Sequence, residues 1–159
     1  PNVPDGTGVW IGIRPRTATP AHMARAAMEG ATLGLNYGLN RMRALGLAPR
    51  EIRLTGGGSK SALWRQIAAD VFNCPVVCPA SDEGAAYGAA LHALWVWEHA
   101  RGAGRPIAEI TRDLVAMDDD TRVVPEPDDV GRYGDLQALF DGAVHDLSRT
   151  FSRHRLLIQ

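Results

Sequence analysis

The stretch EIRLTGGGSKSALWRQIAAD, residues 51–70, decides the fold class. Its first part sets Ile52 and Leu54 between polar neighbours, an alternation that is typical of a short strand. Three glycines follow at 56–58, and the apolar spacing behind them predicts a helix over 59–72. A strand, a glycine-rich loop and a helix in this order are typical of α/β proteins, in which ligands bind at the carboxyl ends of strands.

Another strand and helix are predicted upstream. Residues 8–13 (GVWIGI) alternate β-branched residues with glycine or tryptophan, which predicts a strand. Thr19 is a favourable N-cap residue and Pro20 suits the first helical position, so a helix is predicted over 21–45. Gly46 then provides a plausible end for this helix.

The same order continues downstream. Residues 76–78 predict a buried strand, and residues 81–83 (SDE) are predicted to cap a helix over 83–101. The polar segment 102–127 is predicted as a loop, and an amphipathic helix follows over 130–153. We therefore expect an α/β fold with a short, mainly parallel sheet flanked by helices. Three strands make a poor complete sheet, which indicates a piece of a larger domain.

Composition narrows the function classes. The chain has 159 residues, of which 45% are hydrophobic and 22% are charged, as in an ordinary folded domain. Lys and Arg number 17 against 18 Asp and Glu, so no net charge attracts nucleic acid or an anionic membrane. The longest apolar run, 93–97, is far shorter than the roughly 20 residues of a membrane span. No signal peptide is recognised, and a cytoplasmic location is expected.

The glycine-rich loop is the strongest candidate site. Glycines at 56–58 allow backbone to approach a ligand closely, and a helix that begins at Ser59 offers free N–H groups to a phosphate or a ribose. Two known motifs do not fit: a P-loop needs glycine where Ser59 stands, and the dinucleotide fingerprint needs glycine where Ser61 stands. The loop by itself is compatible with nucleotide contact or with a tight turn. Lys60 could be solvated or could lie beside a phosphate.

Other reactive residue types form no recognisable constellation. Cys74 and Cys78 lack a second pair for a structural zinc site, so two reduced thiols are expected. The acidic run 118–120 departs from the calcium-loop pattern at Val123, which favours a solvated acidic loop. The five histidines are scattered. The sequence therefore predicts neither a self-contained catalytic set nor a metal site.

Three blocks of the chain resemble one family. Residues 8–13, followed eight residues later by 22–29 (HMARAAME), are similar to the C-terminal signature of the FGGY carbohydrate kinases. Residues 52–70 resemble the adenine-nucleotide loop and helix of that family, and residues 83–90 resemble its last Ala/Gly-rich helix. The resemblance covers nearly the whole chain.

Two further segments are more similar to xylulokinases than to other members of the family. Residues 61–70 resemble xylulokinases rather than glycerol kinases, and 125–151 resembles the tyrosine-bearing terminal helix of xylulokinases. Two positions depart from the family pattern. The family usually has Ala where this chain has Ser59, and glycerol kinases have Asn where it has Ser61.

The resemblance implies a fold and an activity. The family has two actin-like, ribonuclease-H-like domains, with ATP mostly on the second and the sugar mostly on the first. Residues 1–159 are expected to be the later part of the second domain, without the sugar-binding domain and its catalytic aspartate. The implied reaction transfers the γ-phosphate of ATP to a sugar hydroxyl, with D-xylulose as the first expectation. Other FGGY kinases (for ribulose, glycerol or gluconate) and a free-standing, non-catalytic nucleotide-binding module remain alternatives.

The resemblance also implies site residues and partners. The nucleotide-binding residues would be Gly56, Gly57, Gly58, Ser59 and Ser61. The expected ligands are ATP or ADP with Mg²⁺ carried on the nucleotide, and a ketopentose held by the absent domain. Neither a catalytic residue nor a metal ligand is assigned within this chain, and the chain alone is expected to be inactive. No nucleic-acid or membrane partner is expected, and a homodimer is left open.

Overall fold

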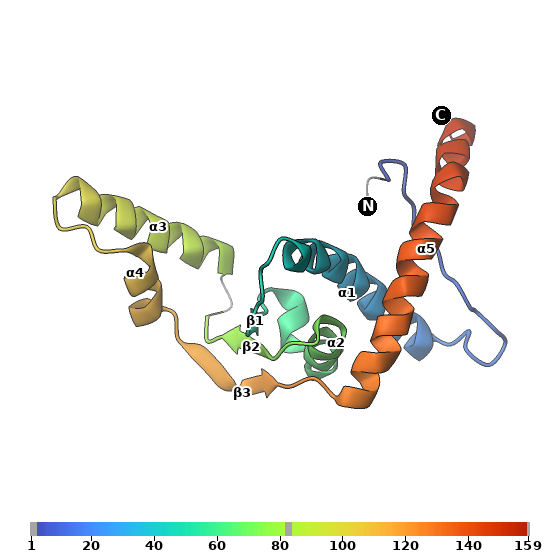
Figure 1. Cartoon of the computed structure of the whole chain (residues 1–159), viewed down its shortest axis with the longest axis horizontal. Coiled ribbons are helices and arrows are strands. Elements are labelled where there is room, and N and C mark those ends of the chain that lie inside the picture. Colours follow the sequence, from blue (N-terminus) through green and yellow to red (C-terminus); the bar gives the residue numbers. More distant parts are fainter. Residues whose placement is uncertain (1–2, 82–83, 159) are drawn as a thin grey trace. The chain divides into compact units, whose positions relative to one another are not determined.

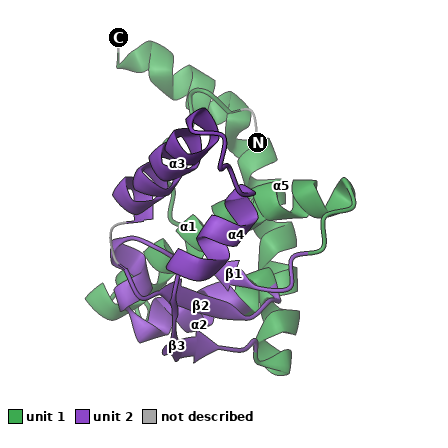
Figure 2. Ribbon diagram, turned by 90° about the vertical axis from the view of Figure 1, so that its left-hand side faces the viewer, with its two compact units in different colours: residues 1–48, 70–72, 126–159 green, residues 49–69, 73–125 purple. Residues whose placement is uncertain are grey.

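The computed structural model describes residues 3–81 and 84–158, which form two compact units. The first unit consists of residues 1–48, 70–72 and 126–159, and the second of residues 49–69 and 73–125 (Figure 2). Within the described residues no helix is both long enough and apolar enough to cross a membrane.

Two long helices make up most of the first unit: α1 (Pro20–Ala44) and α5 (Pro127–Leu157) (Figure 1). The Thr19 side chain accepts a hydrogen bond from the His22 N–H at 3.3 Å, and Gly46 has a φ of +92° just beyond the helix end. The predicted N-cap and helix end are confirmed. The predicted last helix is also confirmed, although it is longer at both ends.

Polar side chains connect α1 to α5. The Tyr133 hydroxyl donates to Glu29 Oε1 at 2.9 Å and accepts from Arg25 Nη2 at 3.3 Å. Asn36 Nδ2 donates to Gln137 Oε1 at 3.0 Å. Because Asn36, Tyr133 and Gln137 are all buried, these directional bonds favour one register of the two helices over others.

Because Tyr133 is buried, the stability of this unit is expected to fall at alkaline pH. Burial raises the pKa of Tyr133 to about 12 from its ordinary value of 10.0. The neutral phenol is therefore favoured in the folded state, and its contribution to stability is complete below pH 10 and is lost as the pH rises towards 12. We expect the free energy of unfolding of the wild type, relative to Tyr133→Phe, to decline over that interval in urea titrations. A difference that stays constant from pH 9 to pH 12 would contradict this assignment.

The strand predicted over residues 8–13 is wrong. This segment has no strand conformation, and its apolar side chains are exposed: Val9 by 48%, Ile11 by 63% and Ile13 by 51% (blue in Figure 1). Alternating apolar residues favour an extended conformation, but a strand forms only where a neighbouring strand pairs with its backbone N–H and C=O groups. The described residues offer this segment no such neighbour.

The second unit contains a three-stranded sheet in the order β1 (Ile52–Arg53), β2 (Val76–Pro79), β3 (Met117–Val123). Strands β1 and β2 are parallel, with Ile52 opposite Val76, whereas β2 and β3 are antiparallel. The α/β class is confirmed, and the expectation of a mainly parallel sheet is wrong, since one of the two pairings among the described residues is antiparallel.

The difference arises in the segment predicted as a loop over 102–127. It contains both α4 (Ile107–Leu114) and β3. Three consecutive aspartates, 118–120, disfavour a strand by propensity. They are tolerated because β3 lies at the sheet edge with these residues exposed, and because Arg122 pairs with Asp119 at 2.9 Å and with Glu51 at 2.8 Å.

Buried side chains of the sheet and of two helices form the core of the second unit. A 3₁₀ turn, η1 (Gly57–Lys60), leads into α2 (Ala62–Phe72), and α3 (Gly84–Ala100) follows β2. The α2 helix thus begins three residues later than predicted. Cys74 and Cys78 are both buried and are not joined by a disulfide. Asp82 and Glu83 of the predicted α3 cap lie outside the described residues. The fully buried side chains include Ile67, Val76, Val77 and Ile110.

Candidate nucleotide-binding loop

The glycine-rich loop lies where open α/β sheets bind ligands. It leaves β1 at Leu54 and enters α2 at Ala62, so it starts from the carboxyl end of a strand that is parallel to β2. The Leu54 N–H donates to the Val77 carbonyl at 2.9 Å, which holds the start of the loop beside β2.

The structure explains two of the three glycines, each by a different physical reason. Gly56 has a φ of +87°, a conformation that L side chains rarely adopt. A Cβ on Gly58 would lie 2.9 Å from Cε3 of Trp64, too close for any side chain. A Cβ on Gly57 would meet no heavy atom within 4 Å. Backbone strain and packing thus explain Gly56 and Gly58, whereas at Gly57 the space beside the backbone is open.

The two predicted serines point their hydroxyls at the chain itself. Ser59 is buried, and its Oγ donates to the Gly56 carbonyl at 2.7 Å, which closes the turn. Ser61 Oγ accepts the Trp64 N–H at 3.2 Å and so acts as a cap for α2. The structure brings all five predicted residues into one turn. Their role in binding nucleotide stays a prediction.

Sequence reasoning missed several residues that shape this loop. Arg65 Nη1 donates to the Ser59 carbonyl at 2.7 Å, and the Cys78 thiol donates to the same carbonyl at 3.7 Å. Arg65 Nε is buried and has no hydrogen-bond partner among the described residues. A buried donor left in this state costs about 1–3 kcal/mol. The available signal was the position of Arg65 one helical turn after Ser61, which directs its side chain back toward the loop.

The start of α3 also adjoins the loop. A Cβ placed on Gly84 would lie 3.2 Å from Oγ1 of Thr55, the residue that precedes the glycines. A side chain at this position would require Thr55 or the helix to shift by a few tenths of an ångström. Within the Ala/Gly-rich beginning of α3 this close approach is confined to Gly84, because the small residues at 85, 86 and 88–90 are exposed.

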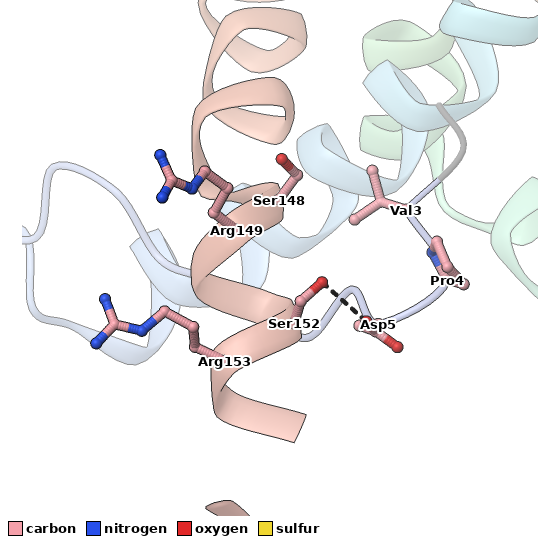
Figure 3. Close-up of a pocket in the computed structure, with 7 residues that line it drawn as sticks. All are labelled: Val3, Pro4, Asp5, Ser148, Arg149, Ser152 and Arg153. Carbon is pink, nitrogen blue, oxygen red and sulfur yellow. Dashed lines mark hydrogen bonds between the residues drawn. The ribbon is translucent and has the colours of Figure 1, made fainter. Parts of the chain in front are cut away.

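Two cavities of the described chain have no residue of the glycine-rich loop in their walls. One, of about 370 Å³, lies in the first unit between residues 3–5 and α5 (Figure 3). Hydrogen bonds from Arg155 and Ser152 lower the pKa of Asp5 there. Figure 3 shows the side chains of Arg149 and Arg153 extending away from the N-terminal segment. With its cations turned outward and a carboxylate at its wall, this cavity is poorly suited to phosphate.

Comparison with solved structures defines the class of protein. The fold is that of sugar kinases with the actin-like ATPase fold. A xylulose kinase from Rhodospirillum rubrum aligns with a TM-score of 0.73 and 28% identity, over 94% of this chain and 28% of that one. A gluconate kinase from Lactobacillus acidophilus aligns with a TM-score of 0.79 and 23% identity, over 94% of this chain and 29% of that one.

Sequence comparison shows the family. The C-terminal domain of the FGGY family of carbohydrate kinases matches residues 2–97, and the chain belongs to this family. The xylulose kinase of Haemophilus influenzae is 37% identical over 133 residues, which are 84% of this chain and 26% of that protein. A glycerol kinase of Alkalilimnicola ehrlichii is 39% identical over 88 residues. The chain therefore spans about a quarter of the length of the Haemophilus relative.

Proposed function

We propose that this chain is the later part of the C-terminal, nucleotide-binding domain of a longer carbohydrate kinase, called here the full-length kinase. In this proposal the loop from Gly56 to Ser61 holds the adenosine part of ATP. The observation that carries the assignment is the open space beside Gly57, at the carboxyl end of a parallel strand and between two structurally constrained glycines. A tight turn alone would not require a third glycine there.

The residues of the chain would position the nucleotide rather than react with it. Backbone at Gly57 can approach the ligand without a Cβ in between, and the start of α2 offers N–H groups and the positive end of a helix dipole. Gly56 and Gly58 hold the backbone in the shape that exposes this position. The hydroxyls of Ser59 and Ser61 support the turn from inside.

The reaction itself would involve groups outside this chain. A sugar hydroxyl attacks the γ-phosphorus, the bond to the bridging oxygen of ADP breaks, and an aspartate implied by the resemblance takes the hydroxyl proton. Bound Mg²⁺ supplies charge neutralisation at the β- and γ-phosphates. Over residues 3–81 and 84–158, no three His, Cys, Asp or Glu side chains are grouped to hold a metal ion, so we assign none of them to Mg²⁺.

D-xylulose is the acceptor that we propose. It is supported by the 37% identity to the Haemophilus influenzae xylulose kinase over most of this chain. Relatives named for other acceptors also match over shorter stretches, including the L-fuculokinase of Escherichia coli, 39% identical over 83 residues. The cytoplasmic location and a homodimer stay predictions.

A substrate panel tests the proposed acceptor. We expect the full-length kinase to have a kcat/KM for D-xylulose that exceeds the values for glycerol, gluconate and L-fuculose by about tenfold or more. The measurement is ADP release in a coupled assay at saturating ATP. A preference for glycerol or gluconate over D-xylulose of about tenfold, equivalent to ~1.4 kcal/mol, would reject D-xylulose while leaving the kinase assignment intact.

A further inference from the structure

The carbonyl of Ser59 connects the glycine-rich loop to two other elements of the second unit. It accepts Arg65 Nη1 at 2.7 Å from α2 and the Cys78 thiol at 3.7 Å from β2. The Ser59 Oγ and N–H in turn bond the Gly56 carbonyl at 2.7 and 3.1 Å. These hydrogen bonds connect Arg65 and Cys78, through Ser59, to Gly56 at the other end of the turn.

Of the two donors, Arg65 is the stronger. A guanidinium N–H is a charged donor and bonds a carbonyl more tightly than a thiol does. The bond also crosses from one helical turn inside α2 back to the 3₁₀ turn that precedes it, so it joins a rigid element to the loop. The hydrogen bond from the Cys78 thiol in β2 to the same carbonyl is weaker.

Arg65 occupies this position at a cost. Its Nε is buried and has no partner among the described residues. A residue that only filled space could be an apolar side chain, which would leave no donor unsatisfied. The side-chain hydrogen bond from Arg65 Nη1 to the Ser59 carbonyl offsets this cost.

We propose that Arg65 is a positioning residue for nucleotide binding: through the Ser59 carbonyl, its guanidinium holds the Gly56–Ser59 turn in the conformation that leaves Gly57 open to ATP. This inference rests on the proposed function of the loop. A loop ordered before the ligand arrives loses less conformational freedom on binding, so removing the bond weakens nucleotide affinity. The sugar lies on other residues and is unaffected.

The test compares variants of the full-length kinase. Arg65→Met keeps a long apolar stem but donates no hydrogen bond. Arg65→Lys keeps a positively charged donor, but it replaces the planar guanidinium, with its fixed set of N–H groups, by a single ammonium group. Arg53→Met is the matched control, because Arg53 lies in the same unit, its side chain is 58% exposed and it pairs only with Glu51 in the described structure. ATP KM, sugar KM, kcat and melting temperature are measured for each.

For Arg65→Met we expect an ATP KM raised about tenfold, or ~1.4 kcal/mol, with kcat and sugar KM within about twofold of the wild type. Arg65→Lys is expected to recover part of the loss, and Arg53→Met to match the wild type. A lowered melting temperature with an ATP KM within about twofold of the wild type would overturn the inference and leave a purely structural residue.

Two further comparisons separate the possible failures. If Gly57→Val raises the ATP KM and Arg65→Met does not, the loop binds nucleotide and only the role of Arg65 is rejected. If neither variant changes the ATP KM, both proposals fail. If Arg65→Met does not fold, Arg65→Lys is judged by the same criteria. Failure of both variants to fold also rejects the positioning role, because Arg65 is then a requirement of the fold.

Discussion

Gly57→Val is expected to raise the ATP KM of the full-length kinase about ten- to a hundredfold, ~1.4–2.7 kcal/mol, with the sugar KM within about twofold of the wild type. A Cβ at this position meets no heavy atom within 4 Å. The Cβ of valine therefore meets no neighbour in the free protein, and we expect the side chain to extend into the space that we assign to the nucleotide. Steady-state kinetics with ATP varied at saturating sugar, and then the reverse, measure both constants.

Two control variants separate a binding effect from a loss of stability. Gly142→Val in α5 places the same side chain at another helical glycine with open space around it, far from the loop in sequence. Gly56→Ala introduces strain at a φ of +87° and is expected to lower the melting temperature. An ATP KM unchanged in Gly57→Val, in a protein with a lowered melting temperature, would remove Gly57 from the site.

The 159-residue chain alone is expected to show no turnover with ATP and D-xylulose, whereas the full-length kinase turns over at a rate near the enzyme median of ~10 s⁻¹. The sequence of the chain carries no recognisable base for the sugar hydroxyl. Phosphoryl transfer depends on positioning both substrates together, which requires the sugar-binding part of the protein. ADP release by equal concentrations of the two proteins measures the difference.

A binding measurement on the same chain distinguishes an inactive folded protein from an unfolded one. The Trp64 ring lies against the backbone of Gly58, so nucleotide bound at the loop is expected to change its fluorescence. Trp64→Phe should abolish the change, while the signals of the other three tryptophans remain. Turnover by the isolated chain near ~10 s⁻¹ would show that it contains a complete active site.

Features governed by neighbours in the sequence were predictable. The start of α1 at Thr19 and Pro20 and its end before Gly46 depend on the conformational preferences of single residues and on bonds across one turn. The α5 helix follows from apolar spacing within a few turns. The family was also recognisable from blocks of contiguous residues, which the comparisons confirm.

Within the candidate site, the sequence pointed to the glycines and serines because they are contiguous. It did not show why glycine is needed at each position. The φ of Gly56 and the position of the Trp64 ring beside Gly58 are known only from the folded structure. The bond from Arg65 to the Ser59 carbonyl likewise depends on where α2 begins, three residues later than the spacing predicted.

Strand pairing was decided only by the tertiary structure. Residues 8–13 have a strand pattern and are not a strand, while β3 contains three aspartates and is one. A strand exists when a partner takes its backbone hydrogen bonds, and the partner lies far away in the sequence. Cys78 pairs with Asp118 across 40 residues, and the acidic side chains of β3 remain at a solvent-facing edge. Local sequence therefore determined α1 with its two ends, α5 and the position of the loop, whereas long-range backbone pairing determined the sheet.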